Sequence, residues 1–300
     1  MHIWVSDYYK NLFGTKVYKL SFDAGCTCPT RDGTKGNRGC IFCSQSGSGE
    51  FTVPFEDFKI PERFKGADAF IAYFQNYTNT YGDLSELSAK WHKALGYDGI
   101  KGLAVATRPD CIGDEVISEL AKISQKHFVQ LELGLQTTNE KSTEYIRRGF
   151  SNADYFDAVT RIHKQAPDIH VVTHIIFGLP GETQEDMMNT VQTAVEAGTD
   201  GIKITCLYVL RGTDLATEYE QGKFEVLSME EYFELLKEAL KLIPDSVIIH
   251  RLTGDPPKAT LIAPKWTEDK KRVMDAVKKT ILKNPLIFDN IKLLPGWRNW

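Results

Sequence analysis

The 300-residue chain lacks any stretch long enough to cross a membrane. Its longest apolar runs, such as VVTHIIFGL at 171–179, have the length of strands. It also lacks a positively charged N-terminal region followed by an apolar stretch, a low-complexity segment, an internal repeat and a linker. We therefore expect a cytoplasmic protein without membrane contact, in a compartment where thiols stay reduced.

Cysteine is scarce, with six in the chain, yet four fall in GCTCPTRDGTKGNRGCIFC at 25–43. In a reducing compartment, the Cys40-x2-Cys43 pair indicates metal or redox chemistry rather than a disulfide. Four ligands would suit structural zinc, although Cys26 and Cys28 are closely spaced for such a site. Three would suit a four-iron cluster that leaves one iron open. The residues alone leave open a cluster, a zinc site and incidental thiols.

Apolar runs alternate with amphipathic stretches along the chain. A helix is predicted from a capping box at Thr183, and another over 228–243. The pattern predicts an α/β protein with one parallel sheet, curved or closed into a barrel, whose chemistry lies at the carboxyl ends of the strands. The strands are expected at 17–25, 69–77, 100–109, 129–137, 170–180, 201–210 and 246–254.

Charge is distributed unevenly over the chain. The net charge is −4, but residues 258–300 hold ten Lys and Arg against four Asp and Glu, a net of +6, which leaves −10 for the rest. Such a basic segment is able to contact a phosphate backbone. A solvated charged helix is the alternative.

Several motifs together resemble a known family. The cysteine loop reads CPTRDGTKGNRGCIFC, and it is followed by AYFQNYTNTY, ATRPDC, LELGLQT, HIIFGLPGET, DGIKI, IIHRLTGD and TLIAPKW. These stretches resemble the radical S-adenosylmethionine (SAM) superfamily, and within it a bacterial subgroup with CPxRDGT and GCxFC. The resemblance implies a partial (β/α)6-type TIM barrel over 1–257, with a cluster loop at 26–49. A basic C-terminal extension, 258–300, would pack on the barrel.

The resemblance also implies the cofactors. Cys28, Cys40 and Cys43 would bind a 4Fe-4S cluster, and Cys26 would be a bystander. SAM would chelate the open iron, and one electron would cleave its sulfur–carbon bond to give a 5′-deoxyadenosyl radical that abstracts a substrate hydrogen. An electron donor such as flavodoxin or ferredoxin is implied as a partner.

Contacts to SAM are carried over position by position. Gln75 and Asn76 stand where the superfamily usually has a Gly-Gly-Glu-like stretch, so only the position is transferred. Arg148 matches an arginine that reaches the SAM carboxylate, with Arg147 as the competing choice. The remaining expected contacts are Phe42, Gln136, Gly181, Leu207 and Tyr208.

Two polar residues within apolar strands have two interpretations each. A buried carboxylate needs a partner. Glu132 therefore either meets a SAM amino or ribose group or belongs to a structural salt bridge. His174 either lies near the SAM ribose or is a satisfied core histidine.

A further set lies outside the general SAM contacts. Arg108, Asp110 and Cys111 follow a predicted strand and are candidates for substrate contact. Cys111 either donates a hydrogen atom or is an inert thiol beside an Arg–Asp pair. His250 and Arg251 are similar candidates.

The substrate is the least defined part of the prediction. Radical SAM relatives that act on tRNA, and the resemblance to this subgroup, favour wobble-uridine maturation, from carboxymethylaminomethyl-uridine towards aminomethyl-uridine. The basic residues Lys270, Lys271, Arg272, Lys278, Lys279 and Lys283 would contact the tRNA. The alternatives are a small-molecule or peptide substrate and a non-catalytic zinc or iron–sulfur protein.

Overall fold

A computed structural model describes residues 2–57, 60–64 and 66–280. The strands are β1 (Tyr18–Asp23), β2 (Val53–Pro54), β3 (Phe70–Phe74), β4 (Ile100–Thr107), β5 (Phe128–Gln136), β6 (Ile169–Phe177), β7 (Gly201–Cys206), β8 (Val209–Leu210), β9 (Ile248–Arg251) and β10 (Leu261–Ala263). The helices are α1 (Val5–Phe13), α2 (Leu84–Leu95), α3 (Asp114–Ser124), α4 (Glu140–Tyr145), α5 (Asn152–Gln165), α6 (Gln184–Glu196), α7 (Asp214–Glu220), α8 (Met229–Leu242) and α9 (Lys270–Thr280). None of the helices in these ranges is both long enough and apolar enough to span a bilayer.

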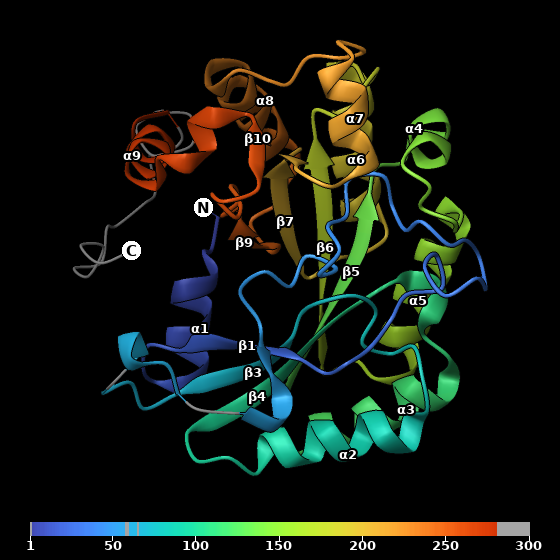
Figure 1. The fold of residues 1–300 in the computed structure, drawn as a ribbon. Coiled ribbons are helices and arrows are strands. Elements are labelled where there is room, and N and C mark those ends of the chain that lie inside the picture. The colour runs from blue at the N-terminus through green and yellow to red at the C-terminus, as the bar shows by residue number, and fades with distance from the viewer. Residues whose placement is uncertain (1, 58–59, 65, 281–300) are drawn as a thin grey trace.

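The main sheet is parallel throughout, with the strand order β2-β1-β3-β4-β5-β6-β7-β9. Figure 1 shows that it curves from β1 to β9 with helices along its outer side. The predicted α/β class and partial barrel are confirmed, and all seven expected strands are present. The short strands β2 and β10 escaped prediction because two or three residues show no periodicity, and the strand expected at 201–210 divides into β7 and β8.

Successive residues of each strand face two different environments. On β5, Val129, Leu131 and Leu133 pack with the fully buried Trp91 of α2 and Tyr155 of α5 in the main core. The core therefore lies between the sheet and its outer helices. Residues at the alternate positions face the inner side of the sheet.

Helix α1, which was not predicted, lies on the inner side of the sheet. Tyr9 is 5% exposed and packs with Ile71 and Tyr73 of β3 and with Ala104 of β4. A bridge between Trp4 and β9 brings this helix to the far edge of the sheet. Helix α1 therefore covers the inner face near the strands' amino ends.

The segment after residue 257 packs on the barrel through two elements. Strand β10 pairs with β8 in an antiparallel two-stranded sheet. Helix α9 buries Val273 and Val277 in the main core. Of the predicted basic residues, Lys283 lies outside the described residues.

The capping box predicted at Thr183 is present, and the helix predicted over 228–243 also begins with a capping box, which was not predicted. Thr183 caps α6, and Ser228 caps α8, where the Ser228 Oγ accepts from Glu231 N–H at 3.2 Å and Glu231 Oε2 accepts from Ser228 N–H at 2.8 Å. Each arrangement satisfies two helix N–H groups that would otherwise lack a partner.

Replacing this cap gives a test of the fold. We expect Ser228→Ala to lower the free energy of unfolding by about 1 kcal/mol and the melting temperature by about 2 °C, because the Glu231 N–H loses its acceptor. Ser228→Asp keeps an acceptor and should melt with the wild type. Equal losses in both variants, measured by thermal unfolding, would contradict the assigned cap.

Candidate functional site

The parallel strands bring their carboxyl ends to one edge, and most of the predicted site residues gather there. The residues that end or follow strands β3 to β7 are Gln75, Asn76, Arg108, Asp110, Cys111, Gln136, Gly181, Leu207 and Tyr208. The structure thus brings these predicted residues to one edge of the sheet, and their roles stay predictions.

The cysteine loop between β1 and β2 is tied to the same edge. The Gly39 N–H donates to Thr30 O at 2.8 Å, which folds the loop back on itself. Ile41 donates to Ile146 O after α4 and accepts from the Leu215 N–H of α7, both at 3.1 Å. The loop therefore has a fixed backbone position without regular secondary structure.

Three of the four loop thiols are close enough for their charges to interact. Burial raises the pKa of Cys40 to about 12, and neighbouring Cys43 and Cys28 add to the rise. Burial also raises the pKa of Cys43. Cys26 lies elsewhere: it packs against the main core, and its charged neighbours include Lys90. The structure groups Cys28, Cys40 and Cys43 and sets Cys26 apart.

Two guanidinium groups lie beside these thiols. Arg31 donates to Cys43 O at 3.1 Å and to Ser44 O at 2.5 Å, and its charge acts on Cys43. The charge of Arg108 acts on Cys40. Within the described ranges, no three His, Cys, Asp or Glu side chains form a group that would hold a single metal ion. Three thiol donors with cations beside them fit an anionic iron–sulfur cluster.

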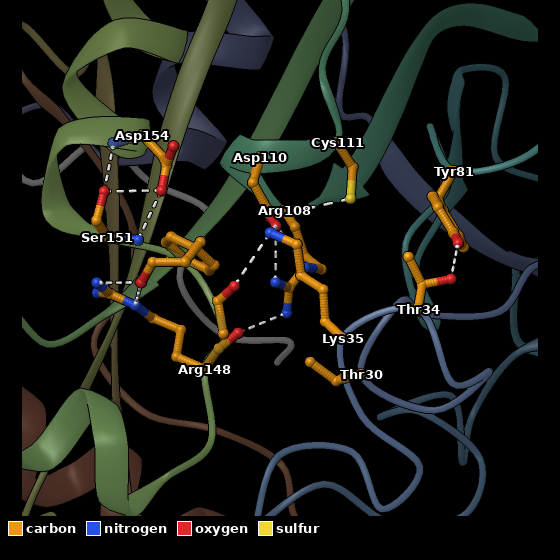
Figure 2. A network of polar contacts seen from close by, with 12 residues as sticks. Thr30, Thr34, Lys35, Tyr81, Arg108, Asp110, Cys111, Arg148, Ser151 and Asp154 are labelled. Atoms are coloured by element: carbon orange, nitrogen blue, oxygen red, sulfur yellow. Dashed lines mark hydrogen bonds and ion pairs between the residues drawn. The ribbon is translucent and has the colours of Figure 1, made fainter.

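A partly buried ion network connects the cysteine loop to β4 (Figure 2). Arg108 and Asp110 form two hydrogen bonds, of 3.0 and 2.9 Å, and the third Arg108 nitrogen donates to Arg148 O at 2.7 Å. Lys35 of the loop donates to the same Asp110 carboxylate at 2.6 Å and to Gly149 O at 3.1 Å. These contacts fix the loop against the ends of β4 and the segment before α5.

Cys111 lies next to this network. Its Sγ is 3.9 Å from Asp110 Oδ1, and burial, together with the Asp110 charge, raises its pKa to about 12. The thiol therefore keeps its hydrogen at neutral pH. The hydrogen bonds of Arg108 and Asp110 are made to other protein groups. Contact of Arg108, Asp110 and Cys111 with a substrate therefore stays a prediction.

The two neighbouring arginines after α4 have different environments. Arg148 is 1% exposed and donates to Leu135 O, Thr137 O, Phe150 O and Asn152 Oδ1 at 2.6 to 3.1 Å. These bonds use all its donor nitrogens. A cofactor carboxylate could bind Arg148 only by displacing some of them.

Arg147 retains a free donor. Its Nη2 donates to Asp214 at 2.5 Å, whereas its Nε is buried without a partner in the described structure. Its carbonyl oxygen is 3.9 Å from Cys40 Sγ. Of the two arginines that the sequence proposed, the contacts favour Arg147.

Backbone strain is concentrated at this edge. The four non-glycine residues with positive φ in the described ranges are Ser48 (64°), Tyr77 (57°), Gln136 (62°) and Arg147 (56°). Gly47 permits the close approach of Tyr77, because a Cβ there would lie 2.4 Å from the Tyr77 ring. Strained backbone of this kind is typical of functional sites.

Polar atoms without partners gather at the same place. In the described structure, Asn76 Oδ1, Thr78 Oγ1 and Gln136 Oε1 are buried without a hydrogen bond. Each such atom costs about 1–3 kcal/mol, which a polar ligand would recover. Gln75 differs, since its Nε2 donates to Ser48 O at 2.8 Å. The unpaired set fits the polar groups of a ligand such as SAM.

An apolar cluster borders these polar atoms. Phe42 of the cysteine loop and Leu207 after β7 pack into the same group with Leu179 of the turn after β6. In that turn, Gly181 has a φ of 82°. Tyr208 instead packs against the main core. Phe42 and Leu207 therefore belong to one apolar cluster, and Tyr208 belongs to another.

Glu132 is a buried hub on the inner face of β5. Its carboxylate is 0% exposed. Burial opposes its ionisation, but Lys19 and Lys203 outweigh that penalty and hold its pKa well below the usual range. Its partners are Lys19 Nζ (2.5 Å), Lys203 Nζ (2.5 Å), Tyr73 Oη (2.5 Å), Gln130 Nε2 (2.6 Å) and His174 Nε2 (2.8 Å). Of the two interpretations of Glu132, these contacts favour the salt bridge.

His174 has a hydrogen-bond partner, as a core histidine would, but its side chain also remains accessible to a ligand. Burial, together with the Lys203 charge, lowers its pKa to about 4, so the imidazole is neutral at pH 7. Its Nε2–H therefore donates to the Glu132 carboxylate. The side chain is nonetheless 33% exposed. Another group can still reach it from the inner side of the sheet.

The last two candidates for substrate contact, His250 and Arg251, differ in their exposure to solvent. His250 is buried, with its Nε2 2.8 Å from His170 Nε2, whereas Arg251 at the end of β9 is exposed. Lys19 and Lys203 are functional candidates that sequence reasoning missed. The signal was present, since Lys203 interrupts the apolar strand GIKITC as Glu132 interrupts its own.

Sequence comparison identifies relatives along nearly the whole chain. YtqA of Bacillus subtilis is 39% identical over 278 residues, which are 90% of this chain and 86% of that protein. YhcC of Escherichia coli is 35% identical over 266 residues, 86% and 85% of the two chains. A tRNA-2-methylthio-N(6)-dimethylallyladenosine synthase of Fusobacterium nucleatum is 29% identical over 60% of this chain and 43% of its own.

A solved structure supports the fold assignment. The Elp3 protein of Methanocaldococcus infernus superposes with a TM-score of 0.62 at 17% identity, over 88% of this chain and 63% of that one. The family model of the radical SAM superfamily matches residues 32–194, and the model of the Radical_SAM C-terminal domain matches residues 199–283. The chain therefore belongs to the radical SAM superfamily and is a radical SAM enzyme, with a 4Fe-4S cluster and S-adenosylmethionine as its cofactors.

Proposed function

We propose that this enzyme binds its cluster through Cys28, Cys40 and Cys43 and modifies the side chain of a tRNA wobble uridine. The convergence of these three thiols, with Cys26 apart, carries the cluster assignment. When bound, the cluster would supply one electron for the cleavage of SAM, and SAM would supply the means of removing a substrate hydrogen. Arg31 and Arg108 stabilise the anionic cluster by charge, and Lys35 holds the loop in place.

SAM would bind between a polar and an apolar wall. The unpaired Asn76 Oδ1, Gln136 Oε1 and Arg147 Nε would satisfy its amino-acid and ribose groups. Phe42 and Leu207, which share one apolar cluster, would contact the adenine. The strained backbone would keep these groups in position before the ligand arrives.

The wobble-uridine substrate rests on separate support. One relative is a tRNA-modifying synthase. Lys271 and Arg272 are exposed on α9, and Lys270 pairs with Asp255 at 3.2 Å, so the basic extension presents cations that tRNA phosphates would attract. The proposed reaction converts carboxymethylaminomethyl-uridine towards aminomethyl-uridine. Residues 258–300 would be the extension that contacts tRNA, and 1–257 the catalytic barrel.

The first prediction concerns the four loop cysteines. Cys28→Ala, Cys40→Ala and Cys43→Ala should each lose iron after anaerobic reconstitution and form only background 5′-deoxyadenosine from SAM and dithionite, because three thiolates are needed. Cys26→Ala is the matched control and should retain both. Loss of product in Cys26→Ala, or tetrahedral zinc bound by all four thiols, would contradict the assignment.

The second prediction separates the neighbouring arginines. Arg148→Gln should lower the melting temperature by about 6 °C, because several buried carbonyls lose their donor. Arg147→Gln should melt close to the wild type yet bind SAM about tenfold more weakly, measured by anaerobic calorimetry. The reverse pattern would return the carboxylate-binding role to Arg148.

The third prediction tests the substrate in cells. Deleting the gene should raise carboxymethylaminomethyl-uridine and lower aminomethyl-uridine derivatives in hydrolysed tRNA, measured by mass spectrometry. The wild-type gene should restore the profile, while the Cys40→Ala gene should not. Identical profiles with and without the gene would remove the tRNA substrate and leave a small molecule or peptide.

A further inference from the structure

The inner face of the sheet carries a group of charged side chains that the cluster and SAM do not use. Lys19 on β1, Glu132 on β5 and Lys203 on β7 all occupy alternate positions that face away from the main core. His174 on β6 joins them through Glu132. Four strands thus direct ionisable groups to one interior location.

The charges of this group do not balance. Glu132 accepts from both Lys19 and Lys203 at 2.5 Å, and His174 is neutral. Arg251 lies opposite Lys203 in the strand register, and its charge acts on Lys19, Lys203 and His174. Two lysines and an arginine therefore surround one carboxylate, and burial, with the neighbouring basic groups, lowers the pKa of Lys19 and holds that of Lys203 well below its usual value. Surplus charge in a partly buried location is costly unless a counter-charge binds.

The cationic side of the group remains accessible. Glu132 is fully buried, but the Lys19 side chain is 20% exposed and that of His174 is 33% exposed. Arg251 is exposed, and no acceptor among the described residues lies within hydrogen-bond or ion-pair distance of its guanidinium. An incoming anion would thus meet donors, while the one carboxylate stays covered.

This location is deeper than the polar atoms proposed for SAM. Glu132, His174 and Lys203 each stand three or four residues before the end of their strands. At about 3.3 Å per residue, they lie about 10 Å below the edge that carries Asn76 and Gln136. A ligand that bridges both levels would place its anionic end at the cations and its centre near SAM.

We propose that Arg251, Lys19, Lys203 and His174 form a receptor for the carboxylate of the substrate. The proposal rests on the proposed function, in which the wobble side chain ends in an aminoacetate group. The Arg251 guanidinium would bind the carboxylate directly, and the His174 Nδ1 would accept a hydrogen bond from the substrate amine. Glu132 acts as a positioning residue that holds the two lysines and His174.

Binding to the reconstituted holoenzyme tests the receptor without turnover. The probes are the nucleoside 5-carboxymethylaminomethyl-uridine, its counterpart 5-aminomethyl-uridine, and N-methylglycine, each titrated by anaerobic calorimetry. Arg251→Gln should weaken binding of the first and third probes about tenfold. It should leave 5-aminomethyl-uridine unchanged. Lys122→Gln, which removes a lysine that is 68% exposed on α3, is the matched control.

Two further measurements distinguish a substrate carboxylate from the SAM carboxylate as the anion that binds these cations. The dissociation constant of SAM and the dithionite-driven yield of 5′-deoxyadenosine should be the same in Arg251→Gln and in the wild type. Weaker SAM binding in Arg251→Gln, with the nucleoside unaffected, would assign the cations to the SAM carboxylate and overturn the receptor. Equal binding of both nucleosides by both proteins would also overturn it, while the proposed function stands.

Failure of the proposed function has a different signature. If the wild type binds neither nucleoside, the wobble substrate is wrong. The receptor then stands if N-methylglycine binds the wild type and binds Arg251→Gln about tenfold more weakly, and it falls if N-methylglycine binds neither. As a second variant, Glu132→Gln/Lys203→Met removes one charge of each sign and should weaken N-methylglycine binding less than Arg251→Gln does.

Discussion

The two-residue period of the parallel strands is the constraint on which this molecule depends. Because neighbouring residues of a strand point to opposite sides, the same segment supplies an apolar outer face and a polar inner face. On β5, Leu131 and Leu133 enter the core while Glu132 between them holds two lysines. A register shift of one residue would place the carboxylate among the helices and the leucines in the interior. Fold and site are therefore specified together.

Much of the fold could be predicted from the sequence, since strands buried on both sides leave continuous apolar runs and capped helices leave a polar signature. Helix α1 escaped although it is amphipathic, because its nine residues are few for a periodic signal and its buried face is largely aromatic. The positions at which the apolar runs end predicted that the candidate residues would meet at one edge of the sheet. The resemblance selected Cys28, Cys40 and Cys43 as cluster ligands. The resemblance selected Arg148 over Arg147, whereas the contacts favour Arg147, because the choice depends on which guanidinium group the folded backbone already satisfies.

The partners of buried charges were also beyond the sequence. Glu132 and Lys203 are 71 residues apart in the chain, and only the register of β5, β6 and β7 brings them together. The sequence showed that Glu132 needs a partner but not which one. The pairing of Arg108 with Asp110 was expected from their proximity in the chain, whereas the contact of Lys35 with Asp110 was not. Long-range contacts of single polar atoms leave no periodic trace.

The main hydrogen bonds that hold the cysteine loop involve Lys35, Gly39, Ile41 and Arg31. Two thiol sulfurs add contacts of their own, Cys28 Sγ with Thr30 Oγ1 at 3.1 Å and Cys40 Sγ with Arg147 O at 3.9 Å. The loop therefore keeps its shape through ordinary protein contacts. Assembly of a metal centre at the three thiols would then be a local event rather than a folding event of the whole polypeptide.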